Sequence, residues 1–198
     1  MTRIVNWSHD LIAEVVNSGD LVVDLTAGKG QDVLALFQMV GPPGQVIAFD
    51  IQAKALASTK SLLEGRGASV RFSPVDEQPV SSRAGIALVE TSHAQLDCYI
   101  AGKPRGIIAN LGYLPGGDQD IITRPQSTVT ALEQASSLLD IGGRVAVTAY
   151  PDHPGGDEEA TAVTKFFTNL PEHIFYVLQL KVSNRPKSPF LFVAEKLI

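Results

Sequence analysis

The chain has 198 residues, of which 44% are hydrophobic, and it carries a formal net charge of −5. A chain of this length and composition can bury one substantial core but has no room for two full domains, so we expect residues 1–198 to form a single domain. The acidic balance excludes a broadly basic nucleic-acid-binding surface, so any RNA contact must be local. Cys98 is the sole cysteine, which excludes an intrachain disulfide and argues against structural zinc; we expect no metal.

The apolar runs are shorter than the roughly 20 residues that a membrane span needs. The N-terminus also lacks the basic and apolar regions of an export signal. We therefore expect a cytoplasmic protein, or an organellar one after processing, that contacts neither membrane nor DNA. The sequence does not determine the oligomeric state, and a homodimer is one of the states that it allows. The candidate cations for a local RNA contact are Arg105, Arg124, Lys181, Arg185 and Lys187.

The first part of the chain predicts two helices that flank a strand and a glycine-containing loop. Ser8 can cap a helix over residues 9–17, where apolar side chains recur at helical spacing. The apolar run 21–25 predicts a buried strand, and the loop 26–32 leads from it into a helix over residues 33–40.

This loop has the features of a nucleotide-binding turn. Gly28 and Gly30 allow the backbone to pass close to a ligand, and Asp32 lies near the helix start, where free N–H groups point outward. The dinucleotide fingerprint requires a small residue at the position of Val33. The loop therefore favours a ligand without a pyrophosphate.

A second apolar run, residues 45–49, ends in Asp50, and an acid at that strand end can bind two ribose hydroxyls. S-adenosylmethionine has such a ribose and no phosphate, so the loop and the acid together fit it better than NAD. The alternative for Asp24 and Asp50 is ordinary capping of a strand end.

The next segment is harder to interpret. A helix is expected over residues 53–64, and both 70–72 and 86–89 can be the third strand. We favour the second run. It places Thr91, Ser92 and His93 at the carboxyl end of the strand, where open α/β sheets bind ligands.

Residues 106–109 predict a fourth strand, which delivers Asn110 and Tyr113 into a glycine-rich loop. The Asn110 carbonyl and a loop carbonyl can accept both N–H bonds of an amine, and the Tyr113 ring offers a face for stacking a base. This arrangement indicates a site that acts on nitrogen. The alternative is a plain turn, because Asn, Gly, Tyr and Pro all suit turns.

The last part of the chain predicts a helix over 125–139, a fifth strand over 144–149 and a helix over 157–169. The runs 174–182 and 190–196 share a short connection and are expected to pair antiparallel. The pattern predicts an α/β, Rossmann-like class I methyltransferase fold, with a seven-stranded, mostly parallel sheet and a C-terminal antiparallel hairpin.

Five motifs stand in this order: Asp-Leu-Thr-Ala-Gly-x-Gly-x-Asp, Phe-Asp-Ile-Gln, Ser-His, Asn-Leu-Gly-Tyr-Leu-Pro-Gly-Gly-Asp and Tyr-Pro-x-His-x-Gly. With them the chain resembles a bacterial family once labelled "putative rRNA methylase" and now assigned as the tRNA wobble-uridine aminomethyl methyltransferase, MnmM. The resemblance implies methyl transfer from S-adenosylmethionine to the primary amine of 5-aminomethyl-2-thiouridine at position 34 of tRNA. The product would be 5-methylaminomethyl-2-thiouridine, and the partner a tRNA anticodon stem-loop.

The resemblance implies roles for most of the candidate site residues. Five further candidates are included because of their own positions in the loops: Thr26, Asp32, Ser92, Asn184 and Arg185. The candidate donor-binding residues are Thr26, Ala27, Gly28, Gly30, Asp32, Asp50, Gln52, Ser92, His93 and Asn110. The candidate substrate-binding residues are Gly112, Tyr113, Tyr150, His153, Asn184 and Arg185. The chain departs from the family pattern at Lys29, Gln31, Val33 and Ala109, which bears on the RNA substrate more than on donor binding.

The candidate catalytic residues are Asn110, Tyr113 and His153, in an in-line attack of a neutral amine on the sulfonium methyl. His153 can relay a proton, and a bond to the backbone is an equal alternative for it. The competing functions are N-methylation of rRNA, of a protein side chain or of a small amine, an NAD-dependent oxidoreductase, and a non-catalytic RNA-binding module. Carbon methylation of a pyrimidine is disfavoured, because Cys98 lies outside the fourth-strand loop.

Overall fold

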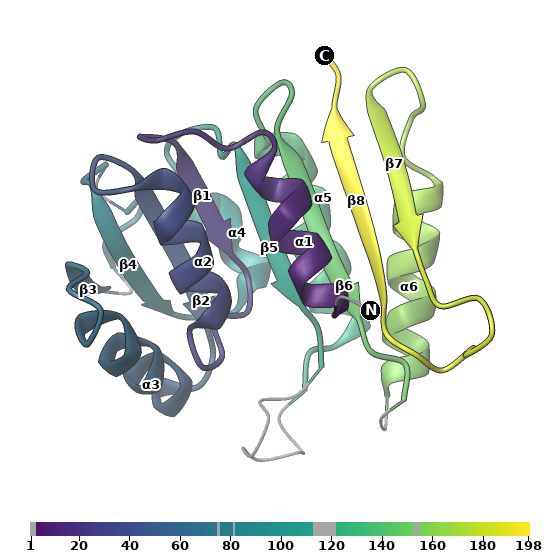
Figure 1. The fold of residues 1–198 in the computed structure, drawn as a ribbon, viewed down its shortest axis with the longest axis horizontal. Helices are drawn as coiled ribbons and strands as arrows, with labels where there is room; N and C mark the ends of the chain where they lie inside the picture. Colours follow the sequence, from purple (N-terminus) through teal and green to yellow (C-terminus); the bar gives the residue numbers. More distant parts are fainter. Residues whose placement is uncertain (1–2, 75, 81, 113–121, 153–154) are drawn as a thin grey trace.

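The computed structural model describes residues 3–74, 76–80, 82–112, 122–152 and 155–198. Within these residues one eight-stranded sheet has the order β3-β4-β2-β1-β5-β6-β8-β7 (Figure 1). The strands are β1 (Leu21–Asp24), β2 (Gln45–Asp50), β3 (Val70–Ser73), β4 (Gly85–Glu90), β5 (Gly106–Asn110), β6 (Arg144–Ala149), β7 (Phe175–Leu180) and β8 (Phe190–Lys196).

The pairing is mostly parallel, as the sequence predicts. Strands β1 to β6 pair in parallel around the central β1, while β8 pairs antiparallel with both β6 and β7. The α/β class with a C-terminal antiparallel pair is therefore confirmed. The predicted count of seven strands is wrong, because both candidates for the third strand are strands. The short β3 escapes the pattern because it is an edge strand, with Phe72 48% exposed.

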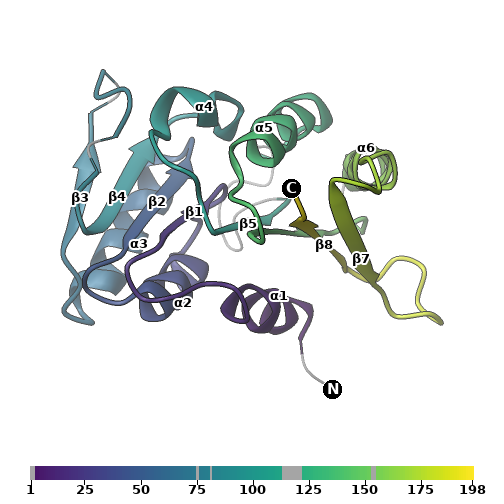
Figure 2. The same cartoon turned by 90° about the horizontal axis from the view of Figure 1, so that it is seen from above.

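Helices cover both faces of the sheet (Figure 2). One layer holds α1 (Ile4–Ala13), α2 (Gln31–Val40) and α3 (Ala53–Glu64). The other holds η1 (His93–Gln95), α4 (Leu96–Tyr99), α5 (Pro125–Leu138) and α6 (Gly156–Thr168). None of the described helices is long and apolar enough to cross a membrane.

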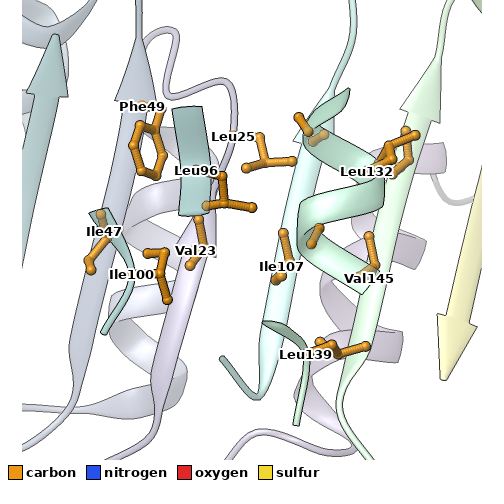
Figure 3. Packing of buried hydrophobic residues seen from close by; sticks show 14 of the residues in the cluster. Val23, Leu25, Ile47, Phe49, Leu96, Ile100, Ile107, Leu132, Leu139 and Val145 are labelled. Carbon is orange, nitrogen blue, oxygen red and sulfur yellow. The ribbon is translucent and has the colours of Figure 1, made fainter. Parts of the chain in front are cut away.

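The central strands are buried on both faces because successive side chains alternate between the two helix layers. Val23, Ile47 and Ile107 belong to the cluster under α4 and α5 (Figure 3). The neighbouring Val22 and Val46 belong to the cluster under α1, α2 and α3. Each fully buried aliphatic side chain contributes about 1.5–3 kcal/mol relative to an exposed one. This double layer makes the strand ends a rigid platform.

The first helix differs from the prediction in position and in its cap. α1 spans Ile4–Ala13 instead of residues 9–17, and its N-cap is Arg3, without a side-chain cap hydrogen bond. Ser8 lies inside the helix, fully buried, and its Oγ donates to the carbonyl of Val5 at 2.6 Å. The helix starts early because Ser8 shares a buried face with Ile12, one turn away, and a small hydroxyl can occupy such a face when it bonds back to its own helix.

Candidate active site

The parallel strands β1, β2, β4, β5 and β6 all end at one edge of the sheet, and a cleft of about 510 Å³ lies there. Asp50 from β2 and Asn110 from β5 both line this cleft, on either side of β1. Strand order reverses at this point of the sheet, which is where open α/β folds bind ligands. The volume falls within the roughly 300–1,000 Å³ of small-molecule sites.

Most of the candidate residues meet in this cleft. Those that line it are Thr26, Ala27, Gly28, Asp32, Asp50, Gln52, Ser92, His93, Asn110, Gly112 and Tyr150. Gly30 lies in the loop but not in the lining, and Asn184 and Arg185 line a neighbouring hollow. Tyr113 and His153 lie outside the described residues.

The glycine loop is shaped by its contact with α3. Gly28 and Gly30 have φ values of +54° and +81°, in the region that favours glycine. A Cβ on Gly30 would lie 2.9 Å from the Thr59 side chain, and Thr59 Oγ1 donates to the carbonyl of Gly28 at 3.0 Å. Gly30 therefore permits close packing of the loop on α3, while Gly28 stays at the cleft surface.

Asp50 is held by the backbone on both sides. Its Oδ2 accepts from the N–H of Gly28 and its Oδ1 from that of Gln52, both at 2.9 Å. Burial raises the pKa of Asp50, and these backbone hydrogen bonds act in the opposite direction. A carboxylate has about four acceptor positions, so capacity remains for a hydroxyl from a ligand.

Asp24 has a structural environment instead. It is fully buried, its Oδ1 accepts from the N–H of Thr26 at 2.9 Å, and it does not line the cleft. Burial and the nearby charge of Asp32 raise the pKa of Asp24 well above its usual value. Strand-end capping, the alternative raised by the sequence, therefore accounts for Asp24. Asp50 also makes capping hydrogen bonds, but in addition it lines the cleft.

Asn110 is held by two hydrogen bonds, and its side-chain oxygen is left unpaired by the described residues. Its backbone N–H donates to Thr26 Oγ1 at 2.8 Å, and its Nδ2 donates to Asp32 Oδ2 at 2.6 Å. The other oxygen of Asp32, Oδ1, lies 2.6 Å from His9 Nε2 on α1. Asn110 Oδ1 is buried and has no hydrogen-bond partner among the described residues. An unpaired buried acceptor costs about 1–3 kcal/mol, so this oxygen is suited to receive an N–H from a ligand.

His93 and Tyr150 contribute two neutral aromatic groups to the cleft. Burial lowers the pKa of His93, while a hydrogen bond to the backbone of Leu25 acts against that shift. His93 Nε2 is buried without a partner in the described part of the chain. Burial and the charge of Asp32 raise the pKa of Tyr150, which keeps its phenol protonated. Ser92 Oγ accepts from the N–H of Ala94 at 3.3 Å and so caps η1.

The wall beyond Asn110 rests on a buried carboxylate that the sequence did not single out. Glu159, 2% exposed, accepts from Thr123 Oγ1 and from Thr128 Oγ1, both at 2.6 Å. Thr123 Oγ1 in turn accepts from the N–H of Gly112 at 2.8 Å. Glu159 lies in the first turn of α6, where an acidic residue is favourable to the helix whatever else it contacts. Its two partners lie 31 and 36 residues away, so no local pattern marks it.

The hairpin loop between β7 and β8 borders the cleft. The hollow with Asn184 and Arg185 shares Asp152, Lys187 and Pro189 with the cleft lining. Two of the candidate residues therefore lie beside the cleft and not within it. Arg105, another candidate cation, precedes β5 and bonds the carbonyl of Val15 at 3.0 Å, which places it at the opposite edge of the sheet.

No group of three or more His, Cys, Asp or Glu among the described residues is arranged to hold a metal ion.

Comparison with known proteins assigns the chain to a family. The model of a family described as "Putative rRNA methylase" matches residues 46–196. The chain belongs to this family. It is also 35% identical over 193 residues to a protein of Arabidopsis thaliana named "tRNA (mnm(5)s(2)U34)-methyltransferase, chloroplastic", covering 93% of this chain and 66% of that one.

Solved structures agree with the family. A "putative rRNA-methylase" from Clostridium thermocellum is 34% identical, with a TM-score of 0.88 over 100% of this chain and 99% of that one. A "putative methyltransferase" from Streptococcus mutans, solved in complex with SAH, is 31% identical with a TM-score of 0.83 over the same shares. The predicted Rossmann-like methyltransferase fold is therefore confirmed.

Proposed function

We propose that this protein is an S-adenosylmethionine-dependent RNA N-methyltransferase. It converts 5-aminomethyl-(2-thio)uridine at tRNA position 34 to 5-methylaminomethyl-(2-thio)uridine, and the name of the Arabidopsis relative contains this product nucleoside. The observation that carries the proposal is the meeting of Asp50 and Asn110 in one cleft, because a ribose-binding acid and an amine-binding amide then face the same space. The chain spans 66% of that relative's length, so the substrate is part of the proposal.

The donor half of the cleft consists of the glycine loop, Asp50 and the end of β4. S-adenosylmethionine supplies an electrophilic methyl group on its sulfonium. Asp50 has acceptor capacity left for a ribose hydroxyl, and Gly28 lets the backbone approach the ligand. Burial keeps His93 neutral, which suits a position beside an adenine ring. Thr26, Ala27, Gln52 and Ser92 complete this wall.

The substrate half is built around Asn110. Its unpaired Oδ1 accepts an N–H of the primary amine and turns the nitrogen lone pair toward the methyl group. Alignment of this kind can be worth about 7–11 kcal/mol of barrier. That exceeds the roughly 10²- to 10⁴-fold expected of a proton acceptor. Tyr150 and Gly112 border the same space, and we assign stacking on the uracil to Tyr113 and proton relay to His153.

The RNA contacts are local, since the chain carries a net charge of −5. Asn184 and Arg185 line the hollow beside the cleft, and Lys187 lines both. Lys187 Nζ lies 3.9 Å from Asp152 Oδ1, and both side chains are more than 70% exposed, so the pair holds Lys187 only weakly. We assign contact with the backbone of an anticodon stem-loop to these residues.

Nucleoside mass spectrometry tests the proposal. tRNA carrying 5-aminomethyluridine is incubated with the protein and S-adenosylmethionine, then digested. We expect a gain of one methyl on that nucleoside alone. Methylation of rRNA instead would favour the activity in the family description. Absence of methyl transfer to any RNA, with transfer to a protein or small amine, would reject the tRNA substrate. Calorimetry with both cofactors excludes an oxidoreductase if S-adenosylmethionine binds and NAD does not.

A further inference from the structure

Three side chains from separate elements form a continuous chain of hydrogen bonds at the rim of the cleft. His9 Nε2 on α1 lies 2.6 Å from Asp32 Oδ1 on α2, and Asp32 Oδ2 accepts from Asn110 Nδ2 at 2.6 Å. Both carboxylate oxygens of Asp32 are therefore engaged by the protein. This leaves Asp32 less suited to the donor-binding role that its place in the glycine loop indicated.

These hydrogen bonds determine the orientation of the Asn110 side-chain amide. A carboxylate oxygen can only accept, so the group facing Asp32 Oδ2 must be the NH₂. The flipped amide would place two acceptor oxygens against each other. The carbonyl oxygen of Asn110 is thereby directed away from Asp32, where it is buried without a partner among the described residues.

His9 fixes the carboxylate itself. By the same reasoning its Nε2 carries the hydrogen that Asp32 Oδ1 accepts. The histidine is anchored because the residues around it on α1, Ser8 and Ile12, are fully buried. Without His9, one oxygen of Asp32 loses its donor and the carboxylate becomes free to rotate within the cleft that it lines.

We propose that His9 and Asp32 are positioning residues that set the Asn110 carbonyl oxygen as the acceptor for the substrate amine. The inference rests on the proposed function, because it concerns the amine that Asn110 receives. It assigns a role to α1, which lies outside the glycine loop and the strand ends. Asp32 acts on the amine through Asn110 and does not bind the donor.

A double-mutant cycle tests the coupling. We expect His9→Ala to lower kcat for methylation roughly 10- to 100-fold, since small misplacements of reacting groups cost this much. Donor affinity, measured by calorimetry with S-adenosylhomocysteine, should change less than about threefold. In an Asn110→Ala background, His9→Ala should change kcat less than about twofold, because the residue through which it acts is gone. Effects that multiply in the double variant, or a loss of donor affinity that matches the loss of kcat, would overturn the proposal.

Matched variants separate positioning from folding. His9→Gln keeps an N–H donor at similar reach and should recover part of kcat, whereas His9→Ala should not. His173→Gln changes an exposed histidine in the turn before β7 and should leave kcat unchanged. Equal activity of His9→Gln and His9→Ala would contradict a role for the hydrogen bond.

A readout without donor or RNA keeps the two proposals apart. The side-chain NH₂ signal of Asn110 in an NMR spectrum, assigned by its absence in Asn110→Ala, should move toward the free-amide position in His9→Ala. An unmoved signal would reject the positioning role. A moved signal in a protein that methylates no amine would instead reject the proposed function while the contact chain stands.

Discussion

At the scale of single residues, burial at the strand ends sets the protonation of the groups around the cleft. Asp24 and Asp50 both have raised pKa values, with burial as the largest cause, yet only Asp50 lines the cleft. His93 has a lowered pKa for the same reason. The buried Asp24 is thus a source of pH dependence in stability, separate from the chemistry of the cleft.

Asp24→Asn should stabilise the protein at neutral pH. The pKa of Asp24 is raised in the fold, so its stabilising contribution is complete below the ordinary pKa of 3.8 and is lost as pH rises through the folded pKa. Asparagine mimics the protonated acid and keeps an oxygen for the Thr26 N–H. Urea unfolding should show the variant more stable than wild type at pH 7, with the difference shrinking toward pH 4. A variant less stable than wild type at pH 7 would contradict a raised pKa for Asp24.

His93 should make the protein sensitive to mild acid. Its folded pKa lies below 6.5, so its stabilising contribution is present above that value and is lost as pH falls toward the folded pKa. The unfolding free energy should fall by about 1.4 kcal/mol per pH unit within that window. In His93→Gln this component of the fall should vanish, and an identical pH profile in variant and wild type would show that His93 does not titrate differently in the two states.

At the scale of elements, the sequence predicts strands and loops that have a local residue pattern, but it does not predict side-chain contacts between residues far apart in the chain. The donor loop, Asp50 and Asn110 follow buried apolar strands, whose pattern is visible in the chain, so their place at one edge could be predicted. Both 70–72 and 86–89 show a strand pattern, but β3 is short and Phe72 is half exposed, so the pattern alone does not show that both runs are strands. The contacts of Asp32 with Asn110 and of Glu159 with Thr128 span 78 and 31 residues and leave no local signal.

Glu159→Ala should destabilise the fold and loosen the wall beyond Asn110. It leaves the hydroxyls of Thr123 and Thr128 without their acceptor. The loss of buried bonds to a charged group should cost roughly 2–3 kcal/mol in unfolding free energy, measured by urea denaturation. Glu158→Ala, one position away and exposed, should stay within about 0.5 kcal/mol. Equal effects of both changes would mean that the charge of the helix start matters and the buried network does not.

At the scale of the whole molecule, the sheet brings two chemistries to the point where its strand order reverses. β2 carries the acid on one side of β1, and β5 carries the amide on the other. The antiparallel β7 and β8 add a cationic hairpin loop beside the same cleft. A chain with net negative charge can therefore present positive charge where the proposed function requires an RNA contact.

Removing the cations of that loop should weaken tRNA binding without affecting the donor. We expect Arg185→Ala combined with Lys187→Ala to lower tRNA affinity and to reduce the slope of log affinity against log salt by about one per lost phosphate contact. Lys165→Ala, exposed near the far end of α6, should leave the slope unchanged. Filter binding over a salt series measures this. An unchanged slope in the double variant would place the RNA elsewhere.

The central claim is that one cleft holds a methyl donor on the Asp50 side and an amine on the Asn110 side. The most direct measurement is a paired one: donor affinity by calorimetry and methyl transfer to 5-aminomethyluridine in tRNA by mass spectrometry, on Asp50→Ala and Asn110→Ala. We predict that Asp50→Ala loses most of its donor affinity, while Asn110→Ala keeps it and loses methyl transfer by roughly 100-fold or more. Full methyl transfer by Asn110→Ala, or unchanged donor affinity in Asp50→Ala, would contradict the account.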